Sequence, residues 1–288
     1  MKTGVCVLIV ISLLCPPVFA ASAEGQDWVA QFVQAVRAYA YKPVPEAVLA
    51  SCDIPKILAC LDPASCIVEV KPSQLDFVRG LVQEGSLERP LLFRPGIAYI
   101  KIRFFGRRTA SEFREALKRQ SQRPPKGLIV DVRSNKGGFL GTARALIETW
   151  ITAGQTYLTL EHRGPQISAC VSSNPSPLAL PTVVLVNSKT ASCPELFAAS
   201  LQDARKAKVV GTITYGKQFV QEAFPLEPGH ILFLTTAKVV SRNTREDFSG
   251  VVPDIQVVDE EAQLKTALKL LRDQGNGPSF RVRGGKAR

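Results

Sequence analysis

Apolar residues recur along the chain at two different spacings. Residues 26–60 place apolar side chains three and four positions apart, first in DWVAQFVQAVRAYAY and then, after a proline break, in VPEAVLASCDIPKILACL. This spacing predicts helices. From Ile97 onward, short apolar runs bounded by turn residues alternate with further helical segments.

The later part of the chain is expected to alternate strands with helices. Strands are predicted at residues 98–105, 127–135, 156–163, 180–187, 206–216, 218–226 and 230–240. Helices are predicted at residues 109–122, 138–153 and 260–273, with another that begins at Ser192. This alternation indicates an α/β fold, layered around a largely parallel sheet and preceded by an N-terminal helical segment.

The first residues have the layout of a secretory signal peptide. MKTGVCVLIVISLLCPPVFA contains one lysine, a short apolar run and small residues suited to cleavage after Ala20 or Ala23. The apolar run is too short to span a bilayer comfortably, and no later segment has a long uncharged apolar run. We therefore expect an exported protein, periplasmic or secreted, without stable membrane insertion.

Four parts of the chain are expected from these patterns. They are a signal peptide (1–20), an N-terminal helical segment with its linker (21–95), an α/β core (96–272) and a basic, disordered tail (273–288). The helical segment either docks a second subunit or covers the core, so homo-oligomerisation is left open.

Charge and composition narrow the choice of partners. The formal net charge is +11, and it falls to +10 when residues 1–20, with one lysine and no acid, are removed. Apart from the tail the basic residues are dispersed, which favours a solvated surface over a nucleic-acid site. The chain has only two histidines, His162 and His230, and no paired metal-ligand spacing, so no metal or other cofactor is expected.

Five cysteines remain after residues 1–20. Three of them are close in sequence, and in an oxidising compartment this group could supply a disulfide, whose pairing the sequence leaves open. The five are Cys52, Cys60, Cys66, Cys170 and Cys193.

Ser192 admits two interpretations. With Glu195 three positions later, it forms the S-x-x-E pattern of a capping box at the start of a helix. A serine on the first turn after a strand is also where hydrolases place a nucleophile.

Two further stretches carry candidate chemistry. The NKGG turn, residues 135–138, lies between a strand and a helix, where backbone N–H groups can point at an anion. Lys217 lies between two predicted strands and can reach inward, where burial would lower its pKa. Each signal alone is weak, and the carboxyl edge of a parallel sheet is where they would meet.

The stretch VNSKTASCPELFAASLQDARKAKVVGTITYGKQFVQ resembles the carboxy-terminal processing peptidases, or tail-specific proteases. In that family a serine in a short A-S element is followed by a lysine 25 positions later, and a glutamine lies four beyond the lysine. Ser192, Lys217 and Gln221 reproduce this spacing. GLIVDVRSNKGGFL, GVVPDIQV and LDPASCIVEV resemble further family elements, so the resemblance extends over most of residues 61–258.

The resemblance implies a ClpP/crotonase-like fold and a Ser/Lys dyad that hydrolyses peptide bonds through an acyl-enzyme. It implies that Lys217 is the base, that Gln221 orients its amine, and that the substrate is a carboxy-terminal or unstructured protein segment. The implied oxyanion hole consists of backbone N–H groups of Gly137 or Gly138 and of Cys193.

The chain departs from the family pattern at three places. Only about 30 residues separate Cys66 from the strand near Ala98, too few for the PDZ domain that family members usually carry there. Gln218 replaces the glycine that commonly follows the lysine, and Cys193-Pro194 replaces two small residues. A degenerate binding module on the same fold is therefore the alternative function.

Other interpretations are weaker. GTITYGK fits the start of a nucleotide-binding P-loop, but Gln218 stands where a hydroxyl is required, and a strand is expected where a helix should follow. Cys193 at a helix N-terminus is a candidate thiol nucleophile without a histidine in a recognisable partner motif. Asp131 and Arg133 fit a structural pair at a strand end, and Asp254 a turn.

Overall fold

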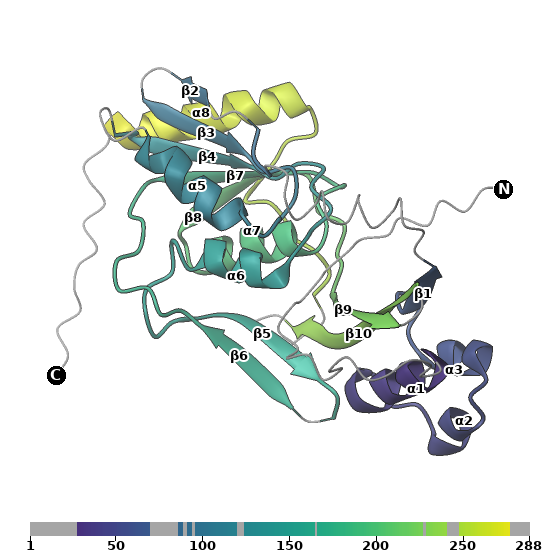
Figure 1. The fold of residues 1–288 in the computed structure, drawn as a ribbon. Helices are drawn as coiled ribbons and strands as arrows, with labels where there is room; N and C mark the ends of the chain where they lie inside the picture. The colour runs from purple at the N-terminus through teal and green to yellow at the C-terminus, as the bar shows by residue number, and fades with distance from the viewer. Residues whose placement is uncertain are drawn as a thin grey trace.

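A computed structural model describes residues 28–69, 86–88, 91–93, 96–119, 124–164, 166–226, 229–240 and 248–276. The expected signal peptide and residues 277–288 of the expected tail lie outside these ranges, whereas residues 273–276 belong to the last helix rather than to a disordered tail. Two sheets with helices between and around them make up the fold (Figure 1). In the described part of the chain, no helix combines the length and the apolar character needed to cross a membrane.

The first sheet has six strands and is mostly parallel. Its order is β11-β8-β7-β4-β3-β2, and only β2 runs antiparallel to its neighbour. The strands are β2 (Leu91–Phe93), β3 (Ile97–Lys101), β4 (Gly127–Asp131), β7 (Thr182–Val186), β8 (Ala207–Gly211) and β11 (Ile255–Gln256). This confirms the expected parallel sheet of an α/β fold.

Helices cover both faces of this sheet, which explains its continuous apolar strands. In β4, Leu128 and Val130 belong to the larger core, whereas Ile129 between them packs toward the C-terminal helix. The larger core includes side chains from α5 (Thr109–Lys118), α6 (Leu140–Ile147) and α7 (Cys193–Asp203). The other face is covered by α8 (Glu260–Asn276) (Figure 1).

The second sheet is antiparallel and was not predicted. Its long strand β10 (His230–Val240) pairs with β9 (Phe219–Leu226) on one side and with β1 (Cys66–Glu69) and β5 (Thr156–His162) on the other. The outer strand β6 (Ile167–Val171) pairs with β5. An alternating pattern predicts a strand but not its partners, because pairing is a long-range property.

The N-terminal helices pack against this second sheet. They are α1 (Trp28–Tyr39), α2 (Glu46–Ala50) and α3 (Ile54–Cys60), and they lie beside β9 and β10 in Figure 1. Phe32, Val36 and Ile57 share a separate apolar core with Phe224 and Leu234. The helices predicted at residues 26–60 are thus confirmed, and they bury one face of the antiparallel sheet.

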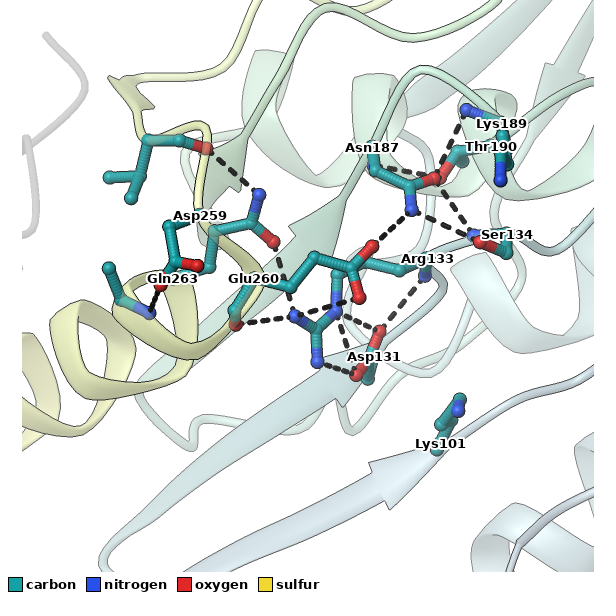
Figure 2. A network of polar contacts seen from close by, with 12 residues as sticks. Lys101, Asp131, Arg133, Ser134, Asn187, Lys189, Thr190, Asp259, Glu260 and Gln263 are labelled. Carbon is teal, nitrogen blue, oxygen red and sulfur yellow. Dashed lines mark hydrogen bonds and ion pairs between the residues drawn. The ribbon is translucent and has the colours of Figure 1, made fainter.

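A polar network fixes the carboxyl ends of β4 and β7 (Figure 2). Asp131 receives hydrogen bonds from the guanidinium of Arg133 at 2.6 and 3.0 Å and from the Tyr99 hydroxyl at 2.6 Å. The Asn187 amide donates to Glu260 at 2.8 Å and accepts from the backbone N–H of Ser134 at 2.9 Å. Asp131 and Arg133 are the structural pair that was expected, and the network ties together the two turns that follow these strands.

Candidate active site

Ser192 lies at the start of α7 with a backbone conformation unlike that of an ordinary helix cap. Its φ is 68° and its ψ is −126°, whereas an N-cap residue normally has extended φ and ψ. A positive φ is strained for a residue with a side chain, and such strain collects at functional sites. The sharp strand-to-helix turn of a nucleophilic serine has this character.

Glu195 holds this conformation in place. Its Oε2 atom accepts a hydrogen bond from the Ser192 N–H at 2.6 Å, which is the well-formed half of a capping box. The Glu195 N–H donates to the Ser192 carbonyl oxygen at 2.8 Å. Ser192 is therefore the N-cap residue of α7. Its backbone is strained, and its side chain lies beside the glycine turn.

The same carboxylate binds the loop that carries Lys217. Glu195 Oε2 also accepts from the Lys217 N–H at 3.0 Å. Glu195 Oε1 accepts from the Gly216 N–H and the Thr214 hydroxyl, each at 2.6 Å. One oxygen atom thus lies within hydrogen-bonding distance of the main chain of both Ser192 and Lys217.

Glu195 is completely buried, and this burial raises its pKa, opposed by its hydrogen bonds from Thr214, Gly216, Ser192 and Lys217. All four contacts come from donors, which suits an ionised carboxylate that can only accept. The capping box predicted from the sequence is thus real, but its glutamate also joins two loops that are far apart in the chain.

Lys217 points inward, as expected. Burial lowers the pKa of its amine, and nearby Cys193, Asp62, Cys66 and Glu195 act in the opposite direction. Its Nζ atom donates to Gln221 Oε1 at 2.6 Å. A lowered pKa favours the neutral amine, which is the form that can accept a proton.

Gln221, on β9, is nearly buried and is held at both ends of its amide. While Oε1 accepts from Lys217, Nε2 donates to the carbonyl oxygen of Ala64 at 2.5 Å. These two contacts define which end of the amide faces the lysine.

The glycine turn lies against Ser192. A Cβ atom at Gly137 would come within 3.1 Å of the Ser192 Cβ and 3.3 Å of its Oγ. A Cβ at Gly138 would come within 2.2 Å of the Phe105 carbonyl oxygen, and both glycines have positive φ. Only glycine fits either position, and the predicted turn therefore meets the predicted serine.

Asn135 shapes this turn, and its side chain binds the N–H group of Gly137 but not that of Gly138. Its side chain donates to the Ile102 carbonyl and accepts from the Gly137 N–H, each at 2.9 Å. The contacts with Phe105 use the Gly137 carbonyl and the Phe139 N–H, not the Gly138 N–H. Of the two glycines, Gly138 is therefore the one whose N–H suits an oxyanion.

Cys193, the first residue of α7, lies next to Gly138. Its buried thiol donates to the Gly138 carbonyl at 3.3 Å. Burial raises its pKa to about 12, although Ser192, Lys217 and the backbone of Gly138 and Cys193 lower it. A thiol that stays protonated is a poor nucleophile, which disfavours the cysteine interpretation.

Several other candidates lie elsewhere. His162 shares a 2.7 Å hydrogen bond with Ser168 in the β5–β6 hairpin, and the His230 ring stacks on Trp28. Since the chain has only these histidines, no histidine base is placed beside Ser192. Strand β9 follows Lys217 where a P-loop needs a helix, so that interpretation is wrong. Asp254 accepts from the Val209 N–H at 2.8 Å and thereby anchors its loop.

The cysteines and the possible metal ligands bear on two expectations from the sequence. Cys52, Cys60, Cys66, Cys170 and Cys193 are all free thiols. Within the described ranges, no group of three histidine, cysteine, aspartate or glutamate side chains is arranged to hold a metal ion.

Sequence reasoning missed Thr214, the side-chain contacts of Asn135 and the Ala64 carbonyl as parts of the site. Thr214 follows β8 at a position where the sequence predicts a continuing strand, and its contact with Glu195 spans 19 residues. The stretch LDPASCIVEV, residues 61–70 and here called the LDP element, was noted, but nothing in its sequence indicated that Ala64 contacts Gln221, 157 residues away.

Comparisons with known proteins found similar sequences among carboxy-terminal processing proteases. The carboxy-terminal processing protease CtpB of Bacillus subtilis (strain 168) is 30% identical over 181 residues, covering 60% of this chain and 38% of that protein. The carboxyl-terminal-processing protease of Synechocystis sp. (strain ATCC 27184 / PCC 6803 / Kazusa) is 32% identical over 170 residues, covering 58% of this chain and 39% of that protein. The chain spans well under half the length of these relatives.

Solved structures share the fold. A lipoprotein from Streptococcus agalactiae superposes with a TM-score of 0.65 at 18% identity, covering 85% of this chain and 95% of that one. The photosystem II D1 C-terminal processing protease superposes with a TM-score of 0.50 at 22% identity, covering 73% of this chain and 53% of that one. The family model described as "Peptidase family S41" matches residues 96–257. The chain belongs to peptidase family S41.

Proposed function

We propose that the protein is a serine peptidase that hydrolyses peptide bonds with a Ser192/Lys217 dyad. The observation that carries this proposal is the Glu195 carboxylate, one oxygen of which accepts from the backbone of both residues. Membership of a peptidase family supports the reaction class. Burial of the lysine, which lowers its pKa, supports its role as the base.

The reaction begins with proton transfer. Neutral Lys217 takes the proton of Ser192 Oγ, and the oxygen attacks the carbonyl carbon of a peptide bond. The protonated lysine then gives its proton to the leaving amine, and an acyl-enzyme remains. Water activated by the same amine hydrolyses the ester and restores the serine.

The negative oxygen of the tetrahedral intermediate needs donors that are already in place. We assign this role to the N–H groups of Gly138 and Cys193, two residues that the 3.3 Å contact between the Cys193 thiol and the Gly138 carbonyl holds side by side. Such donors each contribute about 3 kcal/mol to transition-state stabilisation. Gln221 holds the amine through its Oε1 atom.

The substrate class follows from the relatives. Because CtpB and the Synechocystis protein are named carboxy-terminal processing proteases, we propose a carboxy-terminal or unstructured protein segment as substrate. The stretch between β1 and β3 is too short for a PDZ domain. Residues 1–20 are proposed as a signal peptide that directs the protein out of the cytoplasm.

Cleavage of an unfolded protein tests the proposal directly. Reduced, carboxymethylated substrate protein is incubated with wild type, Ser192→Ala and Lys217→Ala, and the products are followed by mass spectrometry. We expect cleavage by wild type alone, because one variant lacks the nucleophile and the other the base. Full retention in either variant would refute the dyad.

Covalent labelling distinguishes an enzyme from a binding module on the same fold. A fluorophosphonate should label wild type at Ser192 and leave Ser192→Ala unlabelled. Absence of labelling and cleavage in folded wild type would favour the binding module. Ser200→Ala is the matched control, since Ser200 lies on the same helix and donates to the Tyr157 carbonyl at 2.8 Å.

A further inference from the structure

The turn that leads into β1, residues 62–65, joins the N-terminal helices to the side chains around Lys217. Its Ala64 carbonyl accepts from Gln221 Nε2 at 2.5 Å, and the other end of that amide accepts from Lys217 Nζ at 2.6 Å. The proposed base is therefore only two hydrogen bonds away from a segment outside the family match, which begins at residue 96.

Asp62 organises this turn. Its carboxylate accepts from the Ala64 N–H at 2.9 Å and from the Ser65 hydroxyl at 2.7 Å, so it fixes the direction of the peptide groups between them. It also accepts from the Thr235 hydroxyl at 3.0 Å. All three partners are donors, and Asp62 is only 4% exposed.

Thr235 anchors the turn to the sheet. It lies directly across from Gln221 in the β9–β10 pair, next to an irregularity in that pairing. Its hydroxyl donates to Asp62, its N–H donates to Ser65 Oγ at 3.1 Å, and its carbonyl accepts from the Tyr41 N–H at 2.8 Å. All three polar groups of this buried residue are therefore bonded to the N-terminal segment.

We propose that Asp62 is a positioning residue for the peptidase reaction, which holds the Ala64 carbonyl so that the Gln221 amide presents its oxygen to Lys217. This inference rests on the proposed function and assigns a role to the LDP element. The N-terminal segment is then a part of the site rather than a cover for the core.

The direction of the Gln221 amide decides where the lysine can act. With Oε1 toward Nζ, the amide accepts a hydrogen bond from the amine and leaves the nitrogen lone pair for Ser192. A reversed amide would place its NH₂ group against the amine and donate to that lone pair. The Ala64 carbonyl, as an acceptor, stabilises only the first arrangement.

Asp62 also acts on Lys217 through its charge. The groups that face Lys217 are Cys193 and Glu195 on α7, Cys66 on β1 and Asp62 in the turn. All of them favour the protonated amine against the dominant effect of burial, which lowers the pKa. Replacing Asp62 by a neutral residue of the same shape should therefore lower the pKa of Lys217 further.

The experiment compares the pH dependence of kcat/KM in wild type, Asp62→Asn and Thr235→Val. We expect the plateau to fall at least about tenfold in Asp62→Asn, with the acidic limb moved to lower pH. Thr235→Val keeps the negative charge of Asp62 but removes the hydroxyl that donates to it. The plateau of kcat/KM should therefore fall, while the acidic limb of the pH profile stays at the wild-type pH. The rate of fluorophosphonate labelling against pH replaces kcat/KM if turnover is too slow.

Asp53→Asn is the matched control. Asp53 belongs to the same N-terminal segment, and its carboxylate accepts from the Lys56 N–H at 3.1 Å as the cap of α3. We expect an unchanged plateau and limb, because Asn caps a helix about as well as Asp and only the charge is lost, which separates loss of a carboxylate in this segment from loss of positioning. Far-ultraviolet circular dichroism verifies that each variant is folded.

Two results would overturn the inference. One is a folded Asp62→Asn variant whose plateau of kcat/KM and acidic limb are those of wild type. The other is a lower plateau with an unmoved limb in Asp62→Asn together with the same fall of the plateau in Asp53→Asn. A Lys217→Ala variant that retains full cleavage would refute the proposed dyad instead, whatever Asp62 does.

Discussion

The two sheets contribute different halves of the site, and they do so by different means. The parallel sheet provides Ser192 and the glycine turn, each in the connection that follows a strand buried on both faces. The antiparallel sheet provides Gln221 on β9, with Lys217 just before that strand. The first half depends on local strand-to-helix turns, and the second on contacts with the N-terminal segment.

Glu195 is the joint between these halves. It belongs to α7 of the first half and accepts from the main chain and the Thr214 hydroxyl of the second. The strained backbone of Ser192 therefore depends on the Glu195 carboxylate, which accepts a hydrogen bond from its N–H group.

Glu195→Ala should have the largest effect. Four donors lose their acceptor in a completely buried position, so we expect the free energy of unfolding to fall by about 3 kcal/mol or more, and cleavage to become undetectable. Urea denaturation and the cleavage assay measure the two effects. Glu195→Gln should lose activity too, because its NH₂ group would face N–H groups.

Glu261→Ala is the control for this change, since Glu261 lies in the first turn of α8, is exposed and pairs with Lys265. Its stability should stay within about 0.5 kcal/mol of wild type. Residual cleavage in Glu195→Ala above about a tenth of the wild-type rate would contradict the role of Glu195 as the joint.

Gly138→Ala tests the first half alone. The added methyl group would meet the Phe105 carbonyl oxygen at 2.2 Å, so the turn must move away from Ser192. We expect kcat to fall about a hundredfold, the cost of losing one oxyanion donor. Steady-state kinetics on a fluorogenic peptide measures it.

Gly141→Ala is its control, because a Cβ at this helical glycine meets no atom within 4 Å. We expect unchanged kcat and a gain of about 0.5 to 1 kcal/mol in stability. Equal kcat in Gly138→Ala and Gly141→Ala would remove the oxyanion assignment.

The sequence predicts the first half better than the second. Continuous apolar runs predict β4 and β7 because such strands are buried on both faces, and the turns after them follow from their glycines and serine. The strand predicted at residues 98–105 ends at Lys101 instead, since the chain then turns so that Phe105 contacts the glycine turn. The strand predicted at 206–216 ends at Gly211, and Thr214 turns to Glu195.

The second half depends on contacts that no local pattern encodes. The inward position of Lys217 was expected, but its supports were not, because Ala64 and Gln221 are 157 residues apart. The positive φ of Ser192 also lies beyond sequence reasoning, since S-x-x-E predicts the cap and not its strain. The spacing of Ser192, Lys217 and Gln221 was informative only through the resemblance to a family.

Lys217→Met tests the second half through stability. Burial lowers the pKa of this lysine, so below its ordinary value of 10.5 the folded state binds fewer protons than the unfolded state. Wild-type stability should therefore rise with pH between the lowered pKa and that value. We expect Lys217→Met to be more stable by about 1 to 2 kcal/mol near neutral pH.

This advantage should shrink as the pH rises, because the wild-type lysine then costs less to bury. Denaturation with urea from about pH 6 to pH 9 measures the difference. Lys269→Met, at an exposed position of α8, controls for the loss of a lysine. A difference that grows with pH would contradict the lowered pKa.

Tyr99→Phe should have the smallest effect, and it asks whether the network in Figure 2 takes part in catalysis or only in stability. The change removes a donor to Asp131 Oδ2, while the Arg133 guanidinium and N–H keep their bonds to the same carboxylate. We expect a loss of about 0.5 to 1 kcal/mol in the free energy of unfolding and an unchanged kcat. A fall in kcat without a matching fall in Tm would mean that the network transmits its geometry to the glycine turn. The first half of the site would then depend on long-range contacts as the second does.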